Sequence, residues 1–375
     1  MLKIRWEIFV GLCLALILQT SYRFEIGLGL GEIGLALFTG YAVLLYILYW
    51  PKLYKSEYYT LSWWLLIYLS FVLLPVTALY VIFENPGASF RDFFAYFLSF
   101  SFIFSLTIHH SNVKAIAYSV ILFTLMLVVL QFFFGGDDAW YANRFTGGAK
   151  NPNQLGLYMV CCLLLTVIFV KKNLIKIATV TVLLFFGVAT RSDAFTAYLA
   201  IMPIVLALAM FIPKKYFPVI VIPTIAIFWI VISFFSSELM PWLAQTWAQA
   251  DEGGGRLTLY LNGLEAWLSS PATFLIGNGA GNFSGLTGPF QLSEAHNTPI
   301  DVLAMGGLLG FFLFYYFPIK YVITTYILNQ KIVFSCAVGL ICFSLFHFVV
   351  RHPIFWFTIF ALSQFVWTQK KQDTQ

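Results

Sequence analysis

The chain has 375 residues, of which 61% are hydrophobic and 10% are charged, and its mean hydropathy is +0.86. Soluble domains carry about 25% charged residues, so this composition excludes a soluble globular protein and indicates an integral membrane protein. The net charge of +5 does not require a nucleic-acid partner, because basic residues at an inner leaflet explain it. All five cysteines lie in apolar runs, which predicts buried thiols rather than disulfides.

The apolar runs predict an all-α polytopic membrane protein with about 12 transmembrane helices, since a span needs roughly 20 apolar residues. The first run has a basic start but no small-residue cleavage site, which favours a retained span over a signal peptide. The predicted spans lie near residues 6–22, 31–50, 60–83, 92–108, 115–134, 154–170, 177–190, 194–212, 217–236, 298–318, 332–350 and 353–368.

The positive charges predict that both termini are cytoplasmic, because short inner loops retain lysine and arginine. This topology puts 14 of the 21 Lys and Arg residues inside. The inner segments hold Lys3, Arg5, Lys52, Lys55, Lys114, Lys171, Lys172, Lys176, Lys214, Lys215, Lys320, Lys331, Lys370 and Lys371. The outer segments hold Arg23, Arg91, Arg144, Lys150, Arg191, Arg256 and Arg351. Arginine dominates outside, and its planar fork binds phosphate oxygens, so an anionic outer ligand is predicted. We assign Arg351 to topology alone.

Two short outer segments carry polar residues. The first, "GGDDAWYANRFTGGAKNPNQLG" at 135–156, contains Arg144 and ends with Asn151, a predicted helix cap before a proline. Its paired acids Asp137 and Asp138 could bind a divalent cation, although solvated loop acids are the preferred interpretation. The second, "ATRSDAFTAYLA" at 189–200, holds Arg191 in a tight turn at the membrane boundary or in a cavity between helices.

The third outer segment, 237–297, is long enough to fold over a ligand. Its stretch "GGGRLTLYLNGLEAWLSSP" predicts an amphipathic helix with Arg256 at its start. The following "SEAHNTPIDVLAMGGLLG" predicts a helix start with Thr298 as N-cap. Just before it, His296 lies near Glu294, and an imidazole beside a carboxylate can act as a general base. The alternative is that these polar residues only assist the helix start.

The chain resembles the bacterial O-antigen polymerase and ligase family. The resemblance is carried, in the family's order, by "RFTGGAKNPNQLGLY", "TRSDAFTAYLA", "GRLTLYLNGLEAW" with "IGNGAGNF", and "EAHNTPIDVLAMGGLLG". These stretches cover about half of the chain. The second motif usually reads serine, arginine, glycine, whereas here Thr190 and Ser192 flank Arg191.

This resemblance implies a membrane glycosyltransferase of the GT-C type in the bacterial inner membrane, with its active site facing the periplasm. It further implies inverting transfer from undecaprenyl diphosphate during lipopolysaccharide biosynthesis, without a metal or another cofactor. The residues implied are His296 as base, Arg191 and Arg256 as catalytic diphosphate clamps, and Arg144, Asn151, Asn297 and Glu294 as further binding groups. The implied partners are the undecaprenyl-diphosphate-linked glycan, membrane lipid, and a flippase and chain-length regulator of the same pathway, with no nucleic acid.

We therefore divide the chain into three parts. Residues 1–236 are the bundle of spans 1–9, residues 237–297 are the periplasmic loop with active-site residues, and residues 298–375 are spans 10–12 with a cytoplasmic tail. A polymerase is favoured, because the outer loop is small for recognising a bulky lipid A core. An O-antigen ligase is the alternative. A twelve-span transporter or flippase is the weaker one, since the charges cluster at the outer boundary rather than at the midplane.

Overall fold

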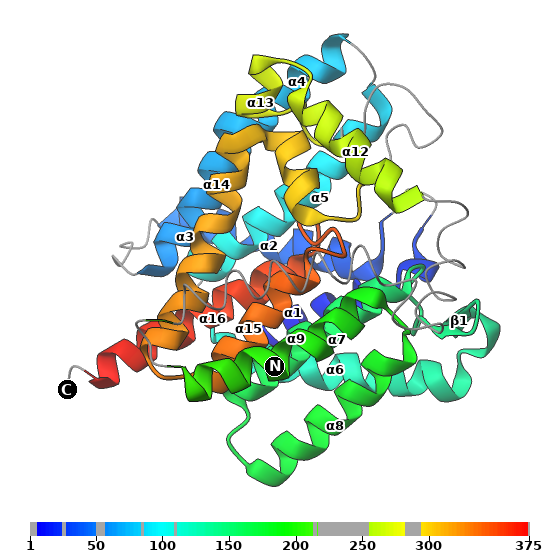
Figure 1. Ribbon diagram of the computed structural model, residues 1–375, viewed down its shortest axis with the longest axis vertical. Helices are drawn as coiled ribbons and strands as arrows, with labels where there is room; N and C mark the ends of the chain where they lie inside the picture. The colour runs from blue at the N-terminus through cyan, green and yellow to red at the C-terminus, as the bar shows by residue number, and fades with distance from the viewer. Residues whose placement is uncertain are drawn as a thin grey trace.

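The computed structural model describes residues 6–24, 28–49, 57–83, 86–108, 111–212, 216, 255–281 and 294–373. Over these ranges the protein is mainly α-helical (Figure 1). The described strands are β1 (Trp140–Tyr141) and β2 (Arg144–Phe145), which pair antiparallel in a short hairpin. The expected all-α class is therefore confirmed.

The N-terminal helices are α1 (Trp6–Leu16), α2 (Leu30–Tyr49), α3 (Glu57–Ile67), α4 (Leu74–Phe83), α5 (Pro86–Ile108), α6 (Val113–Phe134), α7 (Pro152–Phe169), α8 (Asn173–Ala189) and α9 (Asp193–Phe211). A π-helical stretch, Tyr68–Leu73, joins α3 to α4. The C-terminal helices are α12 (Gly255–Leu268), α13 (Pro271–Ile276), α14 (Thr298–Ile327), α15 (Lys331–Phe343) and α16 (Pro353–Asp373).

Most of the predicted spans coincide with helices, but three differ, and the ninth, 217–236, lies outside the described residues. The first span was predicted to reach residue 22, whereas α1 ends at Leu16 and a 3-10 turn, Thr20–Tyr22, follows it. The eleventh span was predicted to reach residue 350, whereas α15 ends at Phe343 and residues 344–352 form turns. The tenth was predicted to end near 318, whereas α14 continues to Ile327, so that Lys320 lies within the helix.

Within the part of the chain that the structure describes, six helical segments are long and apolar enough to cross a membrane, which supports a multi-pass membrane protein. They are Leu30–Leu48, Thr60–Leu79, Val113–Phe134, Pro152–Phe169, Asp193–Phe211 and Thr298–Ile327, and four shorter apolar helices accompany them. The count of about twelve spans and the orientation of the termini stay predictions.

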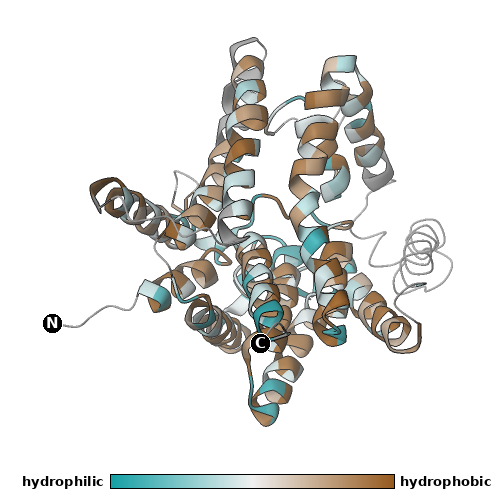
Figure 2. Cartoon of the chain, turned by 90° about the vertical axis from the view of Figure 1, so that its left-hand side faces the viewer, coloured by the Kyte–Doolittle hydropathy of each residue, from teal (hydrophilic) through white to brown (hydrophobic). Residues whose placement is uncertain are grey.

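Aromatic side chains fill the centre of the bundle. Trp356 of α16 is fully buried, and its ring centroid lies 5.1 Å from that of Phe100 and 5.0 Å from that of Phe314. Large apolar side chains also lie on the outside, where Phe134 is 81% exposed and Phe211 is 82% exposed. Figure 2 shows strongly hydrophobic helices around the periphery. Such a surface is stable only where lipid covers it.

Helix α14 is broken at Gly307, whose φ of 60° and ψ of −163° are not helical. In Figure 1 the chain changes direction sharply there, beside α13. The break removes helical donors from two carbonyl groups, and the glycine-rich segment after α13 replaces them. The backbone N–H of Asn278 donates to Ala304 O at 2.8 Å, and that of Gly279 donates to Met305 O at 2.9 Å. The two carbonyl groups freed by the break are therefore hydrogen-bonded within the protein.

The predicted helix in this segment is present as α12, which packs on α13 and α14. Leu259 is buried, whereas Leu261 is 56% exposed and Leu268 is 58% exposed. The Trp267 ring stacks on Phe274 of α13, with centroids 5.1 Å apart, and its Nε1 donates to the Phe274 carbonyl.

Candidate functional site

The segment 294–297 leads directly into α14 and carries most of the predicted polar residues. Asn297 is the N-cap, because its side chain accepts from Ile300 N at 3.2 Å. The prediction of Thr298 as N-cap is therefore wrong by one residue. The Thr298 hydroxyl is used elsewhere: it donates to His347 O at 2.6 Å and accepts from Val349 N at 3.0 Å.

The turn segment 344–352, between α15 and α16, holds the start of α14 in place. The backbone N–H of Thr298 donates to Ser344 O at 2.9 Å, and Asn297 Nδ2 donates to Leu345 O at 2.9 Å. Asn297 is 2% exposed, so both ends of its amide are engaged inside the protein. The structure gives Asn297 a structural task, and its expected contact with a diphosphate stays a prediction.

His296 lies in a left-handed turn, with φ of 53°, a conformation uncommon for residues other than glycine. Its neighbours Ala295 and Asn297 are buried, and Ala295 N donates to the Asp301 carboxylate at 2.8 Å. The side chain of His296, in contrast, is 40% exposed, and its Nδ1 lies 3.9 Å from Glu294 Oε2. The turn thus presents an accessible imidazole beside a carboxylate.

Arg351 completes this cluster, although the sequence suggested only a topological role for it. Its guanidinium forms an ion pair with Glu294 and lies 3.7 Å from Asp92 of α5. Burial by itself would lower the pKa of Arg351, but the nearby acids, with Glu294 foremost, raise it above its ordinary value. The one available sequence signal was an arginine in the very short "RHP" connection, where a partly buried cation needs an acidic partner.

Two further histidines lie buried behind this cluster. The rings of His347 and His352 are stacked, with centroids 5.6 Å apart. Burial, together with the positive charges of Arg351 and Arg23, lowers the pKa of His352 to about 3. His352 is therefore neutral at physiological pH.

A second polar cluster joins the two shorter outer segments. Arg144 Nε donates to the Thr190 carbonyl at 3.1 Å, and the Ser192 hydroxyl donates to Asn153 Oδ1 at 2.7 Å. Asn151 caps α7 as predicted, because its side chain accepts from Asn153 N at 2.8 Å. Sequence reasoning missed Asn153, which directly follows the proline.

The two remaining predicted cations differ in what the structure describes. Arg191 is exposed at the tip of the turn between α8 and α9, with φ of 47°, and its N–H donates to Val188 O at 2.9 Å. Arg256 belongs to the first turn of α12, but its side chain lies outside the described part. The expected clamp of Arg191 and Arg256 on a diphosphate therefore stays a prediction.

The two clusters occupy the same end of the bundle, where α7, α9 and α14 begin and α15 ends. Phe343 connects them: a Cβ added to Gly156 would lie 3.3 Å from Ser192 Oγ and 3.5 Å from the Phe343 ring. The Phe343 ring in turn lies 5.9 Å from that of His347. Gly156 and Phe343 therefore link the cluster around Arg144 to the cluster around His296.

The cation hypothesis for Asp137 and Asp138 gains no support from their surroundings. Both acids are exposed in a 3-10 turn before β1. Within the described ranges, histidine, cysteine and acidic residues form no group of three or more that could hold a metal ion.

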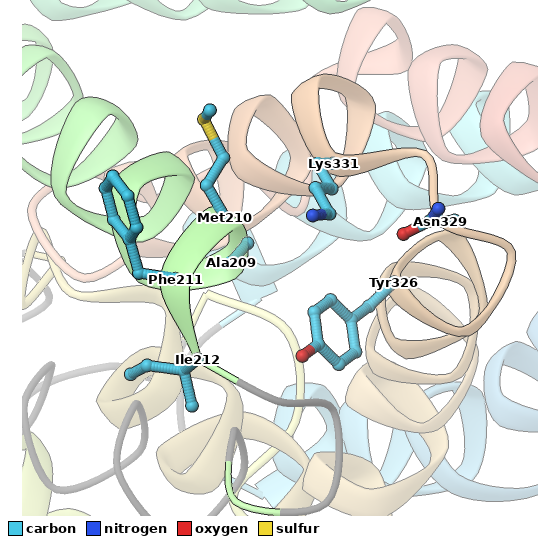
Figure 3. Close-up of a pocket in the computed structure, with 7 residues that line it drawn as sticks. All are labelled: Ala209, Met210, Phe211, Ile212, Tyr326, Asn329 and Lys331. Carbon is cyan, nitrogen blue, oxygen red and sulfur yellow. The ribbon is translucent and has the colours of Figure 1, made fainter.

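A cavity of about 280 Å³ lies at the opposite end of the bundle (Figure 3). It is formed where α9 and α14 end and α15 begins. Its lining consists of Ala209, Met210, Phe211, Ile212, Tyr326, Asn329 and Lys331. None of the predicted site residues lines this cavity.

Comparison with known proteins supports the resemblance found in the sequence. Residues 178–315 match the family model described as O-antigen ligase. The matched range includes Arg191, Arg256, Glu294, His296 and Asn297, and it ends within α14. No curated protein matches the chain. The resemblance to the O-antigen polymerase and ligase family is thus confirmed for this part of the chain.

Proposed function

Because the chain resembles the O-antigen polymerase and ligase family, we propose that it joins undecaprenyl-diphosphate-linked oligosaccharide repeats at the periplasmic face of the inner membrane. The observation that carries this proposal is the turn at His296. It presents a partly exposed imidazole beside Glu294, at the end of the bundle that also holds Arg144 and Arg191. A base and several cations in one region suit the transfer of a sugar from a diphosphate.

In the proposed reaction, His296 takes the proton from the acceptor hydroxyl through its Nε2. The acceptor oxygen then attacks the anomeric carbon of the donor, and the bond from that carbon to the diphosphate oxygen breaks. The electron pair leaves with undecaprenyl diphosphate, and the anomeric centre is inverted. Glu294, which faces Nδ1, favours the tautomer in which Nε2 is the acceptor.

The arginines act on the leaving group in this proposal. Arg191 and Arg256 neutralise the diphosphate as its charge develops, which stabilises the transition state more than the bound substrate. Arg144, held by the Thr190 carbonyl, supplies a third positive charge next to the Arg191 turn. The reaction needs no metal in this scheme.

The alternative is an O-antigen ligase, which transfers the glycan to a lipid A core. The proposed chemistry is the same for both, because only the acceptor differs. We favour the polymerase because the outer loop, residues 237–297, is small for binding a bulky core oligosaccharide.

A transporter or flippase is the weaker alternative, although the broken helix α14 is a feature that transporters share. In transporters the carbonyl groups freed by such a break bind the substrate or ion. Here Asn278 and Gly279 already bind the carbonyl groups of Ala304 and Met305. This observation supports an enzyme over a carrier.

The test is to delete the gene in its host and to restore it either as the parent or as His296→Ala. A polymerase predicts that deletion leaves core capped by a single repeat, and that the parent gene restores the ladder of long glycans. His296→Ala should behave like the deletion, because loss of a general base lowers the rate roughly 10² to 10⁴-fold. Immunoblots of the membrane fraction must show equal amounts of both proteins.

Other outcomes would contradict parts of the proposal. Uncapped core with polymer on the lipid carrier would favour the ligase. A normal ladder after deletion would exclude both enzymes. A normal ladder with His296→Ala would remove His296 from the mechanism.

A further inference from the structure

We propose that Arg351 is a positioning residue for His296, acting through the carboxylate of Glu294. This inference rests on the proposed function, because it assumes that His296 is the base. It adds the turn between α15 and α16 to the catalytic machinery, outside the range matched by the family model.

The Glu294 carboxylate lies between two partners. Its Oε1 forms the ion pair with Arg351, while its Oε2 faces His296 Nδ1 at 3.9 Å. Only 11% of the Glu294 side chain is exposed, so water screens the carboxylate weakly. The position and the negative charge of this carboxylate therefore act on the imidazole, and the ion pair with Arg351 helps to fix where the carboxylate lies.

Arg351 is itself held from several sides, which makes it suitable as a fixed reference. Ser99 Oγ of α5 donates to the Arg351 carbonyl at 3.3 Å. The guanidinium lies 5.7 Å from the centre of the Phe348 ring and 3.7 Å from Asp92. Because the Arg351 guanidinium is held in place, its ion pair restricts the movement of the Glu294 carboxylate.

The backbone of the His296 turn is fixed independently of Arg351. Asp301 of α14 accepts from Ala295 N, and Asn297 is bound to Leu345. The residues on both sides of His296 are therefore anchored, and Glu294 faces the imidazole itself. A purely stabilising ion pair is the competing explanation, since a partly buried pair also costs stability when one partner is removed.

Glu294 faces the imidazole directly, and other charged and titratable groups surround its partner Arg351. Asp92 and Tyr96 belong to α5, and Asp301 belongs to α14. His352 follows Arg351 in the turn after α15, where Arg23 also acts on it. The carboxylate of Glu294 stabilises the protonated imidazole, and the cation of Arg351 reduces that effect. Removing one or the other should therefore shift the protonation of His296 in opposite directions.

The experiment measures kcat/KM for transfer between lipid-linked repeats from pH 5 to 9, with purified protein in nanodiscs. The parent rate should rise with pH as His296 loses its proton. This rise is the acidic limb of the pH profile. In Glu294→Gln the acidic limb should move to lower pH, and in Arg351→Met it should move to higher pH, each by about one pH unit. In Arg351→Lys the acidic limb should lie at the same pH as in the parent, because lysine keeps the positive charge. Turnover should stay reduced, because lysine lacks the planar guanidinium that holds a carboxylate in one orientation. Lys320→Met is the control, because Lys320 lies over the Phe317 ring of α14 and is not among the charges that act on Arg351; it should leave the acidic limb unchanged.

The decisive arm is Glu294→Gln, a neutral substitution of nearly equal size. If the acidic limb of the kcat/KM profile of Glu294→Gln stays at the same pH as that of the parent, and His296→Ala is inactive, the positioning role is overturned and the proposed function stays intact. A fully active His296→Ala would overturn the base itself. Shifts of both variants in the same direction would indicate a general structural effect and would also overturn the inference.

Discussion

Replacing Gly307 by alanine should destabilise the protein by an amount that the structure allows us to work out. The backbone of Gly307 has φ of 60° and ψ of −163°, a region almost restricted to glycine, which costs another residue about 1–3 kcal/mol. A Cβ there would lie 2.3 Å from Leu275 C and 2.4 Å from Ile276 N. These are backbone atoms of α13, so relief requires the helices to separate, at a further cost of about 1–3 kcal/mol. The total destabilisation expected is about 2–6 kcal/mol.

The assay is thermal unfolding in nanodiscs, followed by tryptophan fluorescence. Gly40→Ala is the matched control, because Gly40 lies within α2 with nothing within 4 Å of an added Cβ. Alanine favours a helix over glycine by about 0.5–1 kcal/mol, so this variant should unfold at or slightly above the parent temperature. Gly307→Ala should unfold well below it. Equal midpoints for Gly307→Ala and the parent would refute the close packing of α13 on the broken turn.

Two predictions concern charge at the same end of the bundle. Arg191→Lys should lower the rate of transfer about tenfold or more, because a bidentate contact to phosphate is lost although the charge remains. Arg23→Lys is the control. Near-parent activity of Arg191→Lys would argue against such a contact. For His352, the folded pKa of about 3 lies below the ordinary 6.5, so stability is full above pH 6.5 and falls as the pH decreases toward 3. At pH 5 the loss is about 2 kcal/mol. His352→Gln should therefore lose less stability than the parent between pH 7.5 and pH 5, and an equal loss in both unfolding curves would contradict the neutral buried imidazole.

Features that depend on neighbouring residues could be predicted from the sequence. The helices follow from long apolar runs, whose backbone groups must bond internally in lipid. The closeness of Glu294 and His296 follows from their separation by one residue, and the cap at Asn151 follows from the proline after it. The error at Thr298 is also local: two adjacent residues can both cap a helix, and only the distant turn segment 344–352 decides that Thr298 bonds there and Asn297 caps.

The tertiary structure alone decided which polar residues meet. Arg351 was assigned by sequence to topology, yet it contacts Glu294 and Asp92, which come from other parts of the chain. Arg144 likewise reaches the Thr190 carbonyl across two helices. Hydrophobic periodicity reports whether a residue faces lipid or protein, but not which helix ends lie side by side. Sequence therefore determined the helical membrane class and the candidate base, whereas packing determined the ion pair behind that base.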